Sequence, residues 1–132
     1  MDQLHLVYED ELLKLFWDTQ ACYHIAEWQG AMKSDKLRTA AYACVNASRT
    51  RPASKWLADA SQIGMLERDD QQWMVEDFYP RLARNGVRHV AFVTLMLLPV
   101  RHMNKAFEKG SIEFQYHQTR ADASAWLGSL PG

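Results

Sequence analysis

Residues 55–93 constrain the fold more than any other part of the sequence. A short apolar segment, residues 56–59, is predicted to form a strand. After a loop, a helix is predicted from Asp69 to a glycine stop at Gly86, and a second apolar strand is expected at residues 87–95. A strand, a helix and a strand in this order form a βαβ unit, which implies a parallel sheet. The two strands should be neighbours, because the right-handed crossover returns the chain to the same sheet.

The remaining segments place this unit in a larger mixed sheet. Three strands are expected before it and an edge strand after it, with further helices that begin at Ser34, Pro99 and Thr119. Within the helix of the βαβ unit, Pro80 removes one hydrogen bond and should cause a kink. We therefore expect a single α/β domain over residues 1–132, with a mixed sheet of five or six strands and about four helices. The other strands are expected at residues 4–8, 12–17, 22–28 and 112–116.

The composition argues against two classes of protein. The net charge is −1 over 132 residues, and lysine and arginine are scattered, so the chain carries no electrostatic footprint for nucleic acid. The longest apolar run, residues 90–100, is 11 residues long and too short to cross a bilayer. The N-terminus has no basic segment followed by an apolar core, so no signal peptide is expected. We expect a soluble cytoplasmic protein.

Cysteine and histidine show no pattern typical of a metal or redox site. Cys22 and Cys44 match no zinc or redox spacing, and both are expected to be buried free thiols. Four histidines fall on predicted strands, but none forms an i, i+4 pair with another ligand, so no metal site and no cofactor are predicted. These histidines are His5, His24, His89 and His117.

Four polar residues around the loop of the βαβ unit are candidates for a site. Asp59 and Ser61 are expected at the carboxyl end of a strand, where ligands bind in open α/β sheets. Asp69 and Asp70 are expected at the start of the next helix. Carboxylates in these positions can hold a cation or act as a general base. Helix capping also explains Asp69, the helix dipole explains Asp70, and turn formation explains Ser61. Asp59 is the residue that capping explains least.

The segment after the second strand of the unit is apolar where a surface loop should be polar. Leu95, Met96 and Leu98 precede Pro99 in this segment. A longer strand or burial under a helix accounts for it; the alternatives are a subunit interface or an apolar ligand pocket. Trp73, on the apolar face of the preceding helix, would line such a pocket. The sequence contains no nucleophile elbow and no glycine-rich phosphate loop, so an enzyme has no positive support.

Five blocks of the sequence carry a resemblance to a known family. They are Lys55-Trp56-Leu57-Ala58-Asp59, Asp70-Gln71-Gln72-Trp73, Glu76-Asp77-Phe78-Tyr79-Pro80-Arg81, Gly86-Val87-Arg88-His89-Val90-Ala91 and Phe114-Gln115-Tyr116. With them the chain resembles small bacterial STAS-like proteins, which are similar in fold to anti-sigma-factor antagonists and distantly to lipid-carrying CRAL-TRIO domains. The resemblance covers roughly residues 4–130, and its distinctive part is residues 55–91. It implies a STAS-like fold, whereas members of the group mostly lack an assigned activity.

The resemblance also frames the functional hypotheses. Better-known STAS proteins are switched by phosphorylation of a serine at the start of a helix, but residues 67–71 contain no serine or threonine. Their fixed negative charge resembles a phosphorylated state. The leading hypothesis is a non-enzymatic regulatory or protein-interaction module, a homodimer or the partner of a regulatory protein, which presents residues 64–70 and the following helix. The alternative is a small-molecule or lipid-binding domain with a pocket by Asp59, Trp73 and residues 95–99.

Overall fold

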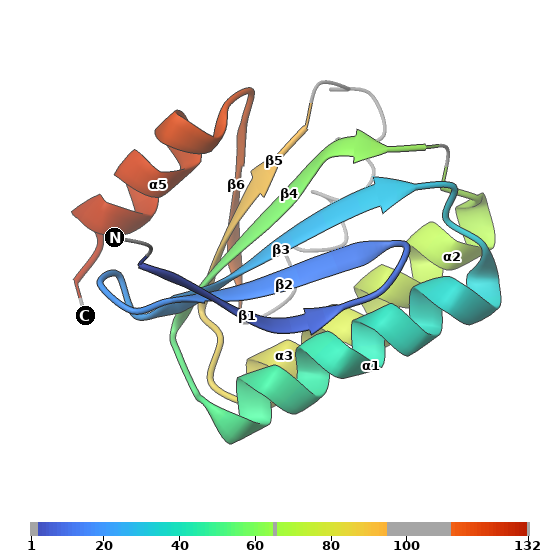
Figure 1. The fold of residues 1–132 in the computed structure, drawn as a ribbon, viewed down its shortest axis with the longest axis horizontal. Coiled ribbons are helices and arrows are strands. Elements are labelled where there is room, and N and C mark those ends of the chain that lie inside the picture. Colours follow the sequence, from blue (N-terminus) through green and yellow to red (C-terminus); the bar gives the residue numbers. More distant parts are fainter. Residues whose placement is uncertain (1–2, 65, 95–111, 132) are drawn as a thin grey trace.

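A six-stranded mixed sheet forms the centre of the fold (Figure 1). The computed structural model describes residues 3–64, 66–94 and 112–131. Within these ranges the strands lie in the order of the sequence; β1, β2 and β3 pair antiparallel, and β3 to β6 pair parallel. The strands are β1 (Leu4–Glu9), β2 (Leu13–Asp18), β3 (Tyr23–Gly30), β4 (Lys55–Ile63), β5 (His89–Val93) and β6 (Glu113–His117).

The βαβ unit forms as predicted. β4 and β5 are adjacent and parallel, with Trp56 opposite Val90 and Asp59 opposite Val93. Half of their residues are buried, including the consecutive residues Trp56, Leu57 and Ala58, as expected where parallel strands have helices on both faces. The predicted edge strand is β6, which pairs with β5. The predicted fold class, an α/β fold with a mixed sheet of five or six strands, is confirmed.

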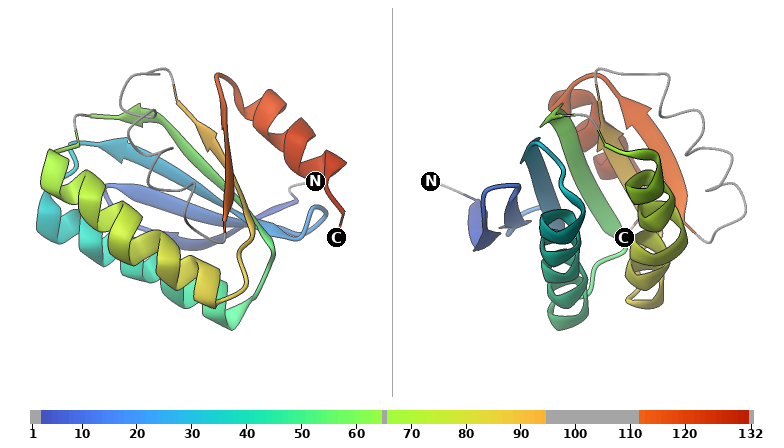
Figure 2. Two further views of the ribbon diagram at one scale, coloured as in Figure 1. Left: turned by 180° about the vertical axis from the view of Figure 1, so that it is seen from behind. Right: turned by 90° about the vertical axis from the view of Figure 1, so that its right-hand side faces the viewer.

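Helices cover both faces of the sheet (Figure 2). On one face lie α1 and a continuous helical segment made of α2, η1 and α3; on the other lies α5. Alternate residues of β4 follow this division, because Trp56 and Ala58 belong to the core under α1 and Leu57 to the smaller core under α5. The helices are α1 (Ser34–Thr50), α2 (Arg68–Trp73), the π-helix η1 (Met74–Phe78), α3 (Tyr79–Arg84) and α5 (Arg120–Ser129).

The helix of the βαβ unit is irregular next to Pro80. We expected a kink there, and the structure has the five-residue π-helix η1 directly before α3, with Pro80 in the first turn of α3. Backbone N–H groups in the first turn of an α-helix have no carbonyl acceptor within the helix. A proline, which has no N–H group, therefore loses no hydrogen bond in that position. The change from α to π hydrogen bonding in η1 places the proline in such a turn.

Two predicted helix ends are confirmed. The helical segment stops before Gly86, whose φ of +106° lies in the left-handed region that favours glycine. At the start of α5, the side-chain oxygen of Thr119 accepts a hydrogen bond from the backbone N–H of Asp122 at 3.1 Å. Thr119 is therefore an N-cap, as its residue type predicted.

Two other predicted caps are wrong. The N-cap of α1 is Lys33 rather than Ser34, and the N-cap of α2 is Glu67 rather than Asp69; neither helix has a side-chain cap. Ser34 and Asp69 lie instead within the first helical turns. Capping therefore does not explain these two residues.

The two cysteines differ in burial. Cys44 is buried on α1, as predicted. Cys22 is exposed, which contradicts the prediction, because it lies in the turn between β2 and β3 with a φ of 61°. Asp18 stabilises this turn by accepting hydrogen bonds from the backbone N–H groups of Gln20 and Ala21.

Part of the predicted pattern lies outside the described residues. The helix expected from Pro99 falls there, as do the candidate interface or pocket residues Leu95, Met96 and Leu98. Among the helices that the structure describes, none has the length and hydropathy needed to cross a membrane.

Candidate functional site

Asp59 lies further from the end of its strand than predicted. β4 continues to Ile63, and a shift in its register with β3 places extra chain after Asp59. Only the pairing with β5 ends at Asp59. Asp59 lies two residues after Leu57, so its side chain points to the same face, which α5 covers, and 13% of that side chain is exposed.

Asp59 is held by an arginine that the sequence analysis missed. Arg120, the first residue of α5, forms ion pairs with Glu27 on β3 and, at 3.8 Å, with Oδ2 of Asp59. Ser61 donates its hydroxyl at 2.6 Å and its backbone N–H at 3.0 Å to Oδ1 of Asp59. Both carboxylate oxygens are thus engaged, and the cluster fastens α5 to the sheet. This geometry fits a structural role for Asp59 and Ser61 better than general-base chemistry.

Asp70 joins two helices rather than facing solvent. Only 2% of Asp70 is exposed, and its Oδ2 accepts a hydrogen bond from Ser34 Oγ at 2.9 Å. The bond connects the first turn of α1 to the first turn of α2, where the helix dipole also favours a carboxylate. Asp69, one residue earlier, is exposed. Of the two predicted carboxylates, only Asp69 therefore presents its charge at the surface.

Replacing Ser34 by alanine should lower the free energy of unfolding by about 1–3 kcal/mol, because the buried carboxylate of Asp70 loses its hydrogen-bond donor. Urea unfolding followed by circular dichroism measures the change. The matched control is Ser124→Ala on the exposed surface of α5, which should leave stability nearly unchanged. Equal midpoints for the two variants would contradict the assigned role of Ser34.

Trp73, the last residue of α2, lies at the surface beside α1 and is only partly buried. Its ring meets that of Tyr42 edge-on, with the ring centroids 5.8 Å apart. The guanidinium of Arg38 lies 5.1 Å from the ring centroid of Trp73, and that of Arg81 lies 5.5 Å from the centroid of Tyr42. Tyr42 is 42% exposed. We call Arg38, Tyr42, Trp73 and Arg81 the aromatic–arginine patch.

Neighbouring side chains hold this patch in place. Asp77 accepts hydrogen bonds from Arg81 Nε at 3.0 Å and Nη2 at 3.4 Å, and these bonds together with its charge raise the pKa of Arg81. On the other side, Trp73 stacks on the buried ring of Phe78 with an interplanar angle of 20°. The patch is therefore ordered before any partner binds, which reduces the entropy lost on binding.

Of the predicted site residues that the structure describes, Asp59 and Trp73 do not share a pocket. Asp59 pairs with Arg120 of α5 on one face of the sheet, whereas Trp73 packs against the core under α1 on the opposite face. The prediction of a pocket that Asp59 and Trp73 share is therefore wrong, because the sheet separates them. The third part of that predicted pocket, residues 95–99, lies outside the described residues.

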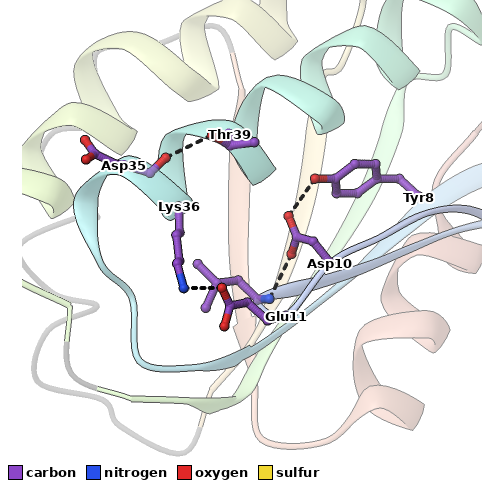
Figure 3. Close-up of a pocket in the computed structure, with 7 residues that line it drawn as sticks. Tyr8, Asp10, Glu11, Asp35, Lys36 and Thr39 are labelled. Carbon is purple, nitrogen blue, oxygen red and sulfur yellow. Dashed lines mark hydrogen bonds and ion pairs between the residues drawn. The ribbon is translucent and has the colours of Figure 1, made fainter.

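A groove of about 380 Å³ lies between the β1–β2 turn and the first turns of α1 (Figure 3). Its polar side chains bind mainly one another. Asp10 accepts hydrogen bonds from the hydroxyl of Tyr8 and from the backbone N–H of Leu12, and Lys36 pairs with Glu11. The bond to Asp10, with burial and the carboxylate charge, raises the pKa of Tyr8 to about 12. These pairings favour a structural role for the groove, namely holding the turn against α1.

The four histidines lie on strands as predicted. They are His5 on β1, His24 on β3, His89 on β5 and His117 on β6. Among the described residues, no group of three or more histidine, cysteine, aspartate or glutamate side chains is placed to hold a metal ion.

Comparison with known proteins identifies the fold. No family model matches the sequence, and no curated protein matches it. One similar solved structure is an uncharacterized DUF3478-family protein with a SpoIIAA-like fold from Shewanella loihica PV-4, with 16% identity, coverage of 94% of this chain and 91% of that chain, and a TM-score of 0.56. Another is an anti-sigma factor antagonist from Mycobacterium paratuberculosis, with 11% identity, coverage of 96% and 93%, and a TM-score of 0.58. The chain therefore has the STAS-like fold that its sequence resembles.

Proposed function

We propose that this STAS-like chain is a bacterial regulatory module that acts in the cytoplasm by binding a protein partner. The fold of the Mycobacterium anti-sigma factor antagonist supports a regulatory role of this kind. The observation that carries the proposal is the aromatic–arginine patch on α1, α2 and α3. Tryptophan, tyrosine and arginine are the residue types that dominate binding energy at protein interfaces.

Residues 64–70, which lead into the helical segment of Trp73 and Arg81 and include its first turn, belong to the same proposed surface. Gly64 and Glu67, before α2, and Asp69, in its first turn, are exposed, and α2 ends at Trp73. Residues 64–70 contain no serine, threonine or tyrosine, so the surface would bind its partner without phosphorylation of a hydroxyl group in this segment. Because Asp70 is buried, the negative charge that the start of α2 presents at the surface comes from Glu67 and Asp69.

Replacing Tyr42 by alanine should weaken binding of the partner at least about tenfold, because an exposed aromatic ring at the centre of an interface contributes roughly 1–2 kcal/mol or more. The tagged full chain would capture partners in the host, and the captured protein would then be purified and titrated by calorimetry. Tyr42→Ala should remain folded, since its ring is largely exposed.

The matched control is Arg49→Ala, an exposed residue of α1 outside the patch, which should bind the purified partner as the unmodified chain does. Equal affinity of Tyr42→Ala and the unmodified chain for that partner would overturn the proposed surface. Self-association through residues 95–98 stays a prediction, because that segment lies outside the described residues; light scattering of the unmodified chain tests it.

A further inference from the structure

A second groove, of about 260 Å³, lies between the edge strand β1 and the last turn of α1. It lies near the amino ends of β3 and β4, at the opposite end of the sheet from the usual ligand position of α/β folds. The residues that matter for its chemistry are His5, Leu6, Val7, His24, Ala47 and Arg51. None of them belongs to the aromatic–arginine patch.

His24 occupies a fixed position beside this groove. The registers of β1 to β4 place His5, Trp17, His24 and Trp56 in one row across the sheet. The imidazole centroid of His24 lies 4.7 Å from the ring centroid of Trp17 and 5.1 Å from that of Trp56. Only 1% of the residue is exposed. The two tryptophans therefore restrict rotation of the imidazole ring.

The imidazole of His24 has unused hydrogen-bonding capacity. Its buried Nδ1 has no hydrogen-bond partner among the described residues. Burial, with a smaller effect of the charge of Arg51, lowers the pKa of His24 to about 4, so the ring is neutral at pH 7. A buried N–H without an acceptor is costly, so the proton belongs on Nε2. The Nε2–H group is then a donor for a bound acceptor.

Arg51 supplies a positive charge beside this donor. Its guanidinium lies 4.9 Å from the ring centroid of Trp17, so the tryptophan that holds His24 also holds Arg51. Within the described ranges no carboxylate lies within 4.0 Å of Arg51, and no acidic residue lines the groove. The full charge of Arg51 exceeds the partial negative charge of about half a unit at the end of α1. The groove therefore favours an anion over a cation or a metal ion.

We propose that this groove binds a small organic acid. The carboxylate of the ligand accepts hydrogen bonds from the guanidinium of Arg51 and from Nε2 of His24. The apolar part of the ligand lies against the aliphatic side chains of Leu6, Val7 and Ala47. The volume of the groove equals that of about nine water molecules, which suits an acid with one ring or a short chain.

The test is an NMR titration of the isotope-labelled full chain with three probes: benzoate, benzamide and inorganic phosphate. Benzoate should shift resonances of β1 and the last turn of α1 saturably, with a Kd of about 1 mM or lower. Benzamide has no charge and phosphate has no apolar part, so each should bind at least about tenfold more weakly. Bound benzoate should also raise the pKa of His24, because a nearby negative charge favours the protonated imidazole. The other titratable or charged side chains that line the groove are His5 and Arg51.

Two variants separate the site from general charge effects. Arg51→Gln should weaken benzoate binding at least about tenfold, while its circular dichroism stays unchanged because Arg51 is exposed. Arg49→Gln, two residues earlier and outside the groove, should bind benzoate as the unmodified chain does. Unchanged binding by Arg51→Gln, or equal binding of benzoate and benzamide, would overturn the site. Equal binding of benzoate and phosphate would overturn the assignment to an organic acid.

Discussion

Replacing Trp56 by alanine should lower the free energy of unfolding by about 3–5 kcal/mol. Trp56 is fully buried in the central strand β4, and its ring contacts His24 on the neighbouring strand. The change removes a large apolar side chain and leaves a cavity that a close-packed core fills only in part. Urea unfolding followed by tryptophan fluorescence and circular dichroism measures it, and Trp56→Phe provides a milder variant should the alanine variant fail to fold.

Trp73→Ala is the matched comparison. From the sequence, Trp73 was expected on a buried helix face, and its loss would then have had the same cost. In the structure the ring is only partly buried, so the change in stability should be no more than about half that of Trp56→Ala. An equal loss for both variants would show that Trp73 is as much a core residue as Trp56.

Acid should destabilise the protein through His24. Its pKa falls from 6.5 in the unfolded chain to about 4 in the fold, with burial as the main cause and the charge of Arg51 as the second. Between these values the unfolded chain binds a proton that the folded chain does not, so stability falls as the pH decreases from about 7 to about 4. The cost is about 3 kcal/mol in total, fully present near pH 4 and absent above about pH 7.

His24→Gln isolates this contribution, because glutamine has a similar polar side chain that does not titrate. Urea midpoints should be measured at intervals from about pH 7.5 to about pH 4.5, which covers most of the interval between the unfolded and folded pKa values of His24. As the pH decreases, the midpoint should fall less steeply for His24→Gln than for the unmodified chain. Parallel pH profiles for the two proteins would show that His24 does not carry the acid sensitivity.

Local patterns in the sequence predicted the parts of the fold that depend on neighbouring residues. Continuous apolar segments identified β4 and β5, alternating apolar and polar side chains identified β6, and the parallel crossover between β4 and β5 is confirmed. Thr119 and Gly86 mark helix ends, because each acts on backbone groups within a few residues. Such signals do not depend on the rest of the chain.

Where prediction failed, a distant residue changed the outcome. Ser34 was expected to cap its own helix, but its hydroxyl bonds to Asp70, 36 residues away in the sequence. The ion pair of Arg120 with Glu27 spans 93 residues and has no local signal. The position of Asp59 was misjudged because β4 continues beyond it through a register shift that no local pattern encodes.

The second groove illustrates the same limit. His24 was noted only as one of four histidines on strands, and no local pattern marked Arg51 as a ligand-binding residue. Their proximity depends on the register between β2 and β3 and on the docking of α1 against the sheet. The row of Trp17, His24 and Trp56 follows once that register is known, so strand pairing was the missing information.

The π-helix η1 affects how the sequence of this chain aligns with the sequences of its homologues. A π-turn carries one more residue than the α-helix it replaces, and one residue corresponds to about 100° of helix rotation. Trp73 precedes η1 and Leu82 follows it, so a one-residue deletion in between would turn the two helix faces relative to each other. A homologue with a regular helix here therefore aligns only with a gap of one inside the helix. An ungapped alignment would assign the wrong residue to the position of Trp73.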